Sequence, residues 1–256
     1  MTRFRKGLFV AAALVISVLA TQCSKTHVTA ANSNVMLINA SPDAPAGINL
    51  WGNGDSLFSN VHFGDSTGYK ENLITGTYGM KLTEYGQHDS LFSFIATWLP
   101  ARYYSIFAVD SFYKIRPSII EDDFRPDSVY ARARILYLCP DGRPLNIYFR
   151  VLSDTSDQRI DTITINPSQA RIFNDQNITN AFGNFTTLKT KRDSAEVLAT
   201  LYHIDTTGVK DTVVLKQKFA ITRTHFYTFY LAGFFDTTRA TASNRLHLEL
   251  IEHIPR

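Results

Sequence analysis

The stretch VMLINASPDAPAGINLW, from Val35 to Trp51, occurs a second time in altered form as RILYLCPDGRPLNIY, from Arg134 to Tyr148. Each version is an apolar run, a turn with a small residue, proline and aspartate, a second proline, and another apolar run around one asparagine. Two such copies predict two copies of one structural unit. The turn residues are Ser41, Pro42, Asp43 and Pro45 in the first copy and Cys139, Pro140, Asp141 and Pro144 in the second.

The rest of the chain consists of short apolar or alternating runs separated by Gly, Pro, Asn and Asp. This spacing is typical of antiparallel β-sandwiches, and no stretch predicts a long amphipathic helix. A later pair of runs also matches, Arg102–Val109 and His225–Ala232. We therefore predict an all-β fold of two tandem antiparallel, immunoglobulin-like β-sandwich repeats. They are expected at residues 33–124 and 130–256, with a linker at 125–129 and longer hairpins in the second repeat.

The first residues are typical of an export signal. Three basic residues precede an uncharged apolar run from Leu8 to Ala20, which is shorter than the about 20 residues that a membrane-spanning helix needs. We predict a signal peptide over residues 1–23 and a flexible tether over residues 24–32. A membrane-anchoring helix is the alternative.

The sequence LATQCS, from Leu19 to Ser24, resembles a bacterial lipobox, in which the cysteine becomes the new N-terminus and carries lipid. Ala20 and Gln22 depart from the usual pattern, although Bacteroidota-type lipoproteins resemble this looser form. Several acyl chains, each buried methylene worth ~0.8 kcal/mol, hold a protein on a membrane almost permanently. We expect Cys23 to be lipidated and the protein to sit in a bacterial cell envelope, on the outer membrane. Ordinary cleavage near Ala20 or Ala30 is the competing interpretation.

The charge balance argues against a nucleic-acid partner. The chain has 26 basic and 23 acidic residues, and removal of the three basic residues before Cys23 leaves 23 of each. Nucleic-acid binding needs a basic footprint, which a neutral mature chain does not supply. The predicted partners are therefore the membrane, through the lipid, and a glycan or an envelope protein.

Two turn residues could carry chemistry. Cys139 could be a nucleophile, but no histidine partner can be assigned to it, so we favour a small buried turn residue. Asp43 and Asp141 could bind calcium, which needs six or more oxygens. We favour carboxylates that cap backbone N–H groups two residues further on, as aspartate does in turns.

The acidic and histidine clusters do not assemble a site. Glu121, Asp122 and Asp123 are interpreted as a solvated strand end, because neighbouring strand residues point to opposite faces. His247 and His253 would lie about 20 Å apart on one strand, too far to share a metal ion. We predict no catalytic residues, no metal and no cofactor.

Aromatic residues on the matched runs form a second apolar face. Tyr103 and Phe107 in the first repeat, and Phe226 and Tyr230 in the second, face away from the expected core, separated by Ser105 and Thr228. This stripe could stack on sugar rings or on a partner protein. We favour packing between the repeats, because a large apolar patch normally has a covering partner.

The Ser41–Pro45 motif, the Gly76–Tyr78 turn and the run Tyr103–Val109 together resemble bacterial envelope proteins that carry domain of unknown function 4397. The resemblance covers the mature chain twice and is weaker in the second copy. It implies a tandem β-sandwich lipoprotein of the cell envelope and no assigned activity. We therefore expect a non-catalytic binding, adhesive or scaffolding module. A lipid-anchored glycan-acting hydrolase or a carbohydrate-binding protein is the alternative.

Overall fold

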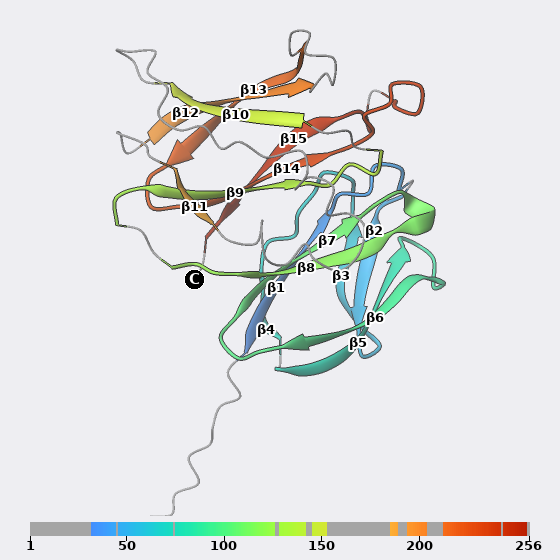
Figure 1. Cartoon of the computed structure of the whole chain (residues 1–256). Helices are drawn as coiled ribbons and strands as arrows, with labels where there is room; N and C mark the ends of the chain where they lie inside the picture. Colours follow the sequence, from blue (N-terminus) through green and yellow to red (C-terminus); the bar gives the residue numbers. More distant parts are fainter. Residues whose placement is uncertain are drawn as a thin grey trace, which may run out of the picture. The chain divides into compact units, whose positions relative to one another are not determined.

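The computed structural model describes residues 32–256, apart from residues 45, 74, 126–127, 142–144, 153–184, 189–193, 204–211, 242 and 255–256. Residues 32–256 form one compact unit. Its described part contains the strands β1 to β15 and a single 3-10 turn, η1 (Phe112–Lys114), with no α-helix (Figure 1). The prediction of an all-β fold is therefore confirmed. Among the residues placed, no helix has the length and apolarity needed to cross a membrane.

The first half of this unit contains two four-stranded sheets, which we call A and B. Sheet A has the order β4-β1-β7-β8, with β1 and β7 parallel and the other pairs antiparallel. Sheet B has the order β3-β2-β5-β6 and is antiparallel. The bounds in sheet A are Ser33–Asn39 for β1, Lys70–Leu73 for β4, Tyr103–Val109 for β7 and Arg116–Asp122 for β8. Those in sheet B are Ile48–Gly52 for β2, Asp55–Val61 for β3, Gly76–Glu84 for β5 and Ser90–Trp98 for β6.

The second half contains sheet C, with the order β11-β9-β14-β15, and sheet D, with the order β10-β12-β13. In sheet C, β9 and β14 are parallel, as β1 and β7 are in sheet A. Sheet C therefore repeats the order of sheet A strand for strand. The bounds in sheet C are Ala131–Tyr137 for β9, Thr186–Leu188 for β11, Phe226–Ala232 for β14 and His247–His253 for β15. Those in sheet D are Leu145–Leu152 for β10, Ser194–His203 for β12 and Thr212–Thr222 for β13.

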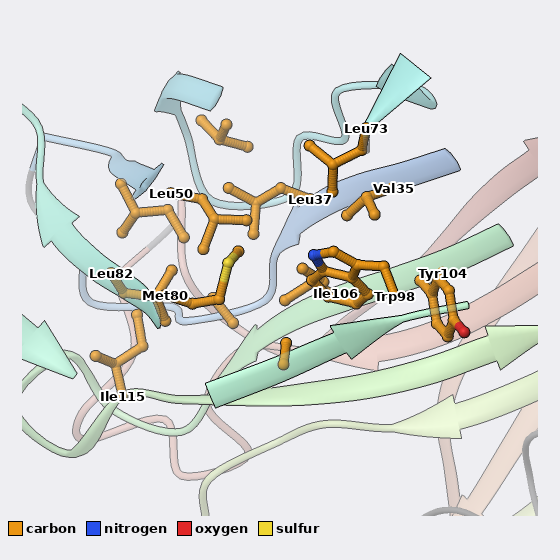
Figure 2. Close-up of a cluster of buried hydrophobic side chains, with 14 residues drawn as sticks. Val35, Leu37, Leu50, Leu73, Met80, Leu82, Trp98, Tyr104, Ile106 and Ile115 are labelled. Carbon is orange, nitrogen blue, oxygen red and sulfur yellow. The ribbon is translucent and has the colours of Figure 1, made fainter. Parts of the chain in front are cut away.

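One face of sheet A packs against sheet B. Successive strand residues point to opposite faces, so alternate residues of β1 and β7 share this core with β2, β5 and β6. Figure 2 shows Leu37, Ile106 and Trp98 pointing into the same cluster, and the rings of Trp98 and Tyr104 lie 5.0 Å apart. The second half has an equivalent core between sheets C and D, in which Phe219 of β13 packs edge-on against Phe229 of β14 at 5.2 Å.

A third apolar cluster joins the two halves. It is built from the opposite faces of sheets A and C, so that β1, β7 and β8 meet β9, β14 and β15. Sheets A and C are thus covered on both faces, and the layers follow the order B, A, C, D. Two-sided burial explains why these strands have near-continuous apolar runs where a half-exposed strand would alternate. The buried members of the cluster are Met36, Ile38, Ala40, Phe107, Val109, Ile120, Leu136, Leu138, Tyr230, Ala232 and Ile251.

Candidate functional site

The contact between sheets A and C contains both aromatic packing and a group of buried polar side chains. Phe107 of β7 and Tyr230 of β14 are fully buried, with ring centroids 5.9 Å apart in an edge-to-face arrangement. The Tyr230 hydroxyl donates to the Gly64 carbonyl at 2.8 Å. The other two residues of the predicted stripe, Tyr103 and Phe226, lie nearer the polar group, where both pack against Phe124.

An ion pair between the halves lies in this contact. The guanidinium Nη2 of Arg134, on β9, lies 2.5 Å from Oδ1 of Asp122, on β8, and the two side chains are 1% and 0% exposed. Two hydroxyls donate to the other carboxylate oxygen, from Ser105 at 2.7 Å and from Tyr69 at 2.8 Å. A buried charge pair is tolerated only when additional hydrogen bonds satisfy it, and this one has them.

The ion pair is part of a closed ring of hydrogen bonds. Nε of Arg134 donates to the Thr228 hydroxyl at 2.7 Å. The same hydroxyl lies 2.7 Å from Nε2 of His253. Nδ1 of His253 lies 2.9 Å from the hydroxyl of Tyr69, which donates to Asp122. With a neutral imidazole, all these contacts are satisfied when Thr228 donates to Nε2 and Nδ1–H donates to Tyr69.

Burial changes the acid–base behaviour of the ring. Burial, reinforced by the nearby Arg134 guanidinium, holds the pKa of His253 well below its usual range, which favours a neutral imidazole. Burial also raises the pKa of the Asp122 carboxyl, opposed by Arg134 and by the hydroxyls of Ser105 and Tyr69. The Tyr69 pKa is raised by burial and by the carboxylate of Asp122. In a poorly solvated site the charged forms are disfavoured unless they are paired.

Equivalent strand positions supply opposite halves of the ring. In sheet A, β1 places Met36 beside Ser105, whereas in sheet C, β9 places Arg134 beside Thr228. Likewise Asp122 is paired with Tyr103, and His253 is paired with Phe226. The first half thus provides the anion where the second has a neutral histidine, and the second provides the cation where the first has methionine.

An aromatic shell surrounds the ring. Phe124, which follows β8, lies within 6.0 Å of the rings of Tyr69, Tyr103 and Phe226. The Arg134 guanidinium lies 4.5 Å from the ring centroid of Phe185. The aromatics exclude water and thereby strengthen the electrostatic interactions inside the shell.

A cleft of about 590 Å³ opens beside the ring. Its lining includes Asn34, Thr67, Tyr103 and Glu252 at polar positions and Met36 and Ile251 at apolar ones, and of the ring residues only Tyr69 lines it. The carboxylate of Asp122 and both imidazole nitrogens of His253 already have partners within the hydrogen-bond ring. The arrangement can join the two halves, and neither the carboxylate of Asp122 nor the imidazole of His253 lines the cleft.

The aspartates of the turn motif tie together remote loops. Oδ1 of Asp43 accepts the backbone N–H of Phe112 at 2.6 Å, in the loop that follows β7. Oδ1 and Oδ2 of Asp141 accept the N–H groups of Phe235 and Asp236, both at 2.8 Å, in the loop that follows β14. These carboxylates do cap backbone N–H groups, and the described partners lie in remote loops; the positions two residues further on, Pro45 and Arg143, lie outside the described residues. Each cap closes a gap of more than 60 residues in the chain.

The remaining turn residues are mostly buried. Ser41 and Cys139 are buried at equivalent positions, and burial, with a contribution from Asp141, raises the pKa of the Cys139 thiol well above its usual range. A thiol held protonated is a poor nucleophile. Pro42 is buried and Pro140 is half-buried. Pro45, Pro144 and Cys23 lie outside the described residues, as do the predicted signal peptide and nearly all of the predicted tether.

Two sequence interpretations are corrected here. Asp122 is not at a solvated strand end, because it shares the inward face of β8 with Ile120 and is fully buried against Arg134. The alternation of apolar and polar residues from Leu246 to Ile254 predicts a half-exposed last strand, but His253 at the end of β15 is only 2% exposed. Sequence reasoning also missed Tyr69, Phe124 and Phe185, which lie outside the matched runs. The signal available for Arg134 was its position between the apolar residues Ala133 and Ile135.

Among the described residues, no group of three or more His, Cys, Asp or Glu side chains is arranged to hold a metal ion. Residues 33–148 match the family model described as "Domain of unknown function (DUF4397)". The match covers the first half of the compact unit and continues through β9 into β10. It therefore includes both partners of the ion pair, Asp122 and Arg134. No curated protein matches the chain.

Proposed function

We propose that this protein is a non-catalytic binding or scaffolding module of a bacterial cell envelope, built from two tandem copies of one β-sandwich unit and held on the outer membrane by lipid on Cys23. The observation that carries the proposal is the ring between sheets A and C. The ionisable groups Asp122 and Arg134 neutralise each other there, and both imidazole nitrogens of His253 are hydrogen-bonded within the same ring. An active site needs such groups turned toward a substrate.

The ring also supports a mechanical role. A covered pair of sheets with a dry ion pair resists separation, because pulling the halves apart would expose apolar surface and two unpaired charges. In a module of this kind, a ligand bound to one half is held at a fixed position relative to the other half. The matched strand orders of sheets A and C and the shared aspartate caps support the duplication of one unit.

The proposed membrane localisation can be tested with the full-length chain in a bacterial host. Cys23→Ala should abolish incorporation of radiolabelled palmitate and move the protein from the membrane fraction to the soluble fraction. A Cys139→Ala variant is the matched control and should remain in the membrane fraction. If the wild type takes up no palmitate and fractionates like Cys23→Ala, the lipid anchor is wrong.

Catalysis is tested by incubating the wild-type chain with envelope polysaccharide and measuring reducing ends. We expect no release above background. Release by the wild type that is lost in Glu252→Gln, a change at the carboxylate that lines the cleft, with the unfolding transition of the variant unchanged, would favour the hydrolase alternative. Retention on a glycan array without any release would instead favour the carbohydrate-binding form of the module.

A further inference from the structure

The edge strand β6 differs in composition from the other strand edges of this molecule. β6 reads SLFSFIATW over its nine residues and contains no charge, proline or glycine. Sheet B has the order β3-β2-β5-β6, so that one side of β6 pairs with β5 and the other has no strand partner among the described residues. An uncharged strand with high β-propensity at a sheet edge is a template for pairing with another strand.

The other described edges carry features that discourage such pairing. β8 contains Pro117 and the exposed Glu121, and β13 presents Lys216 and Lys218 to solvent. β3 pairs with β2 through two register irregularities. β4 and β11 have only four and three residues, β15 carries charge at Glu249 and Glu252, and β10 contains Arg150. Proteins use charges, proline, bulges and short strands in this way to protect their edges.

Exposed apolar side chains concentrate at the same edge. Ile95 is 77% exposed, and Phe92 on the same strand is 38% exposed. Leu99 just after β6 and Tyr85 just before it are 49% and 47% exposed. The remaining exposed large apolar residues among those described, Tyr113, Val129 and Ile254, are scattered over other elements. Ile95 and Phe92 point to opposite faces of sheet B, so that each face of this edge exposes an apolar side chain. A group of exposed apolar residues at one edge marks an interaction site, whereas isolated ones need no explanation.

We propose that β6 pairs antiparallel with β6 of a second copy of this chain, so that the two copies of sheet B form one continuous eight-stranded sheet. A second copy fits because β6 carries no charge, so that two copies of it can pair without like charges opposite each other. Residues opposite each other in an antiparallel pair point to the same face. Ser93, Ile95 and Thr97 of the two copies would therefore form one outer row.

This pairing closes on itself. A two-fold pair uses the same edge on both copies and leaves no free β6 for a third, so that it gives a dimer and no fibre. The inference does not rest on the proposed function, because it follows from strand composition alone. It would hold whether or not Cys23 carries lipid, and the fractionation of Cys23→Ala does not bear on it.

The test is sedimentation equilibrium of the full-length chain in a detergent matched to the solvent density. We expect the wild type to sediment as a dimer at micromolar concentrations. Ile95→Lys should raise the dimer dissociation constant at least about tenfold, because it places like charges across the pair. Ile254→Lys makes the same change at an exposed isoleucine that follows the charged strand β15, and it should leave the dimer intact. Far-UV circular dichroism checks that both variants stay folded.

A wild type that sediments as a single copy at all concentrations reached would overturn the proposal, including the case in which β6 captures a strand of a different envelope protein. Equal weakening by Ile95→Lys and Ile254→Lys would also overturn it, because the association would then be unspecific. Cross-linking supplies the second readout. If β6 pairs as proposed, an oxidised disulfide should form between copies in at least one of the variants Ser93→Cys, Ile95→Cys and Thr97→Cys, and in none at Ile254→Cys.

Discussion

The two halves of the molecule share a strand order but differ in what they place at their common face. Sheet A offers Met36 and Asp122 at two of its positions, and sheet C offers Arg134 and His253 at the equivalent ones. The other equivalent positions have similar side chains in the two halves: Ser105 corresponds to Thr228, and Phe107 corresponds to Tyr230. The difference shows how a repeated fold can acquire a specific internal contact by changing two positions in each copy.

A second difference concerns the bend after the third strand of the shared order. Asp110 follows β7 at a backbone φ of 76°, and Gly233 follows β14 at a φ of 98°. A Cβ at Gly233 would lie 2.3 Å from the carbonyl oxygen of Arg245, so that only glycine fits there. Asp110 has room for its side chain, and its Oδ1 accepts the N–H of Ser111 at 2.8 Å. The same bend is therefore crowded in one half and open in the other.

The largest effect is expected from making the second half resemble the first at the ion pair. Arg134→Met would leave the Asp122 carboxylate buried without a countercharge, which typically costs about 3–5 kcal/mol in the free energy of unfolding. Urea denaturation measures this loss. The double variant Arg134→Met with Asp122→Leu should recover a large part of it, since both charges are then absent.

Arg102→Met is the control for this prediction. Its pair with Glu121 is 57% and 43% exposed and is expected to contribute under about 1 kcal/mol. Equal losses from the two arginine variants would mean that the buried pair does not join the halves.

A smaller loss is expected where the halves agree. Phe107→Ala removes a fully buried ring from the contact with Tyr230 and should cost about 3 kcal/mol, at the low end for a buried aromatic, because Tyr230 can move into part of the cavity. Tyr113→Ala, at a side chain that is 91% exposed, should change the free energy of unfolding by less than about 0.5 kcal/mol. A Phe107→Ala variant as stable as wild type that loses a ligand would show that the stripe is a binding platform.

The smallest effect is a pH dependence from the half that carries histidine. The folded-state pKa of His253 lies below its unfolded value of about 6.5, so that the unfolded chain binds the extra proton first. Stability should therefore fall as the pH drops below about 6.5, by at most about 1.4 kcal/mol per pH unit for one proton. Chemical denaturation at a series of pH values measures the slope in wild type and in His253→Gln. The slopes of the two proteins should differ in this range, and identical slopes would remove His253 as the cause.

Much of this architecture could be predicted from the sequence. Alternation along Tyr103–Val109 assigned Tyr104 and Ile106 to one face and Tyr103 and Phe107 to the other, and the structure places them so. Both faces were apolar, which indicated a covering partner before any contact was known. Period-two alternation is a local property of a strand and survives whatever packs against it.

The polar part of the contact could not be predicted in the same way. Asp122 stands between two acidic neighbours, and a run of acidic residues is ordinarily solvated, so that its burial depends on Arg134 on another strand and on Tyr69 in a loop. The hydrogen-bond partners of the turn aspartates could not be predicted for a related reason. Capping by Asp43 was foreseeable from residue type, but its partner at Phe112 is fixed by tertiary structure. Sequence patterns identify which groups need a partner and not which partner they find.

The unequal charges of the two faces also restrict how such a chain could be rearranged genetically. Recombination between the two copies could yield a protein made of two first halves or of two second halves. The former would bring two Asp122-type carboxylates together in a dry contact, and the latter two Arg134-type guanidinium groups. Neither product would have a countercharge, and each would be disfavoured by both repulsion and desolvation. The order of the halves along the chain is thereby protected by folding itself, since exchanged products would be poorly stable and open to proteolysis.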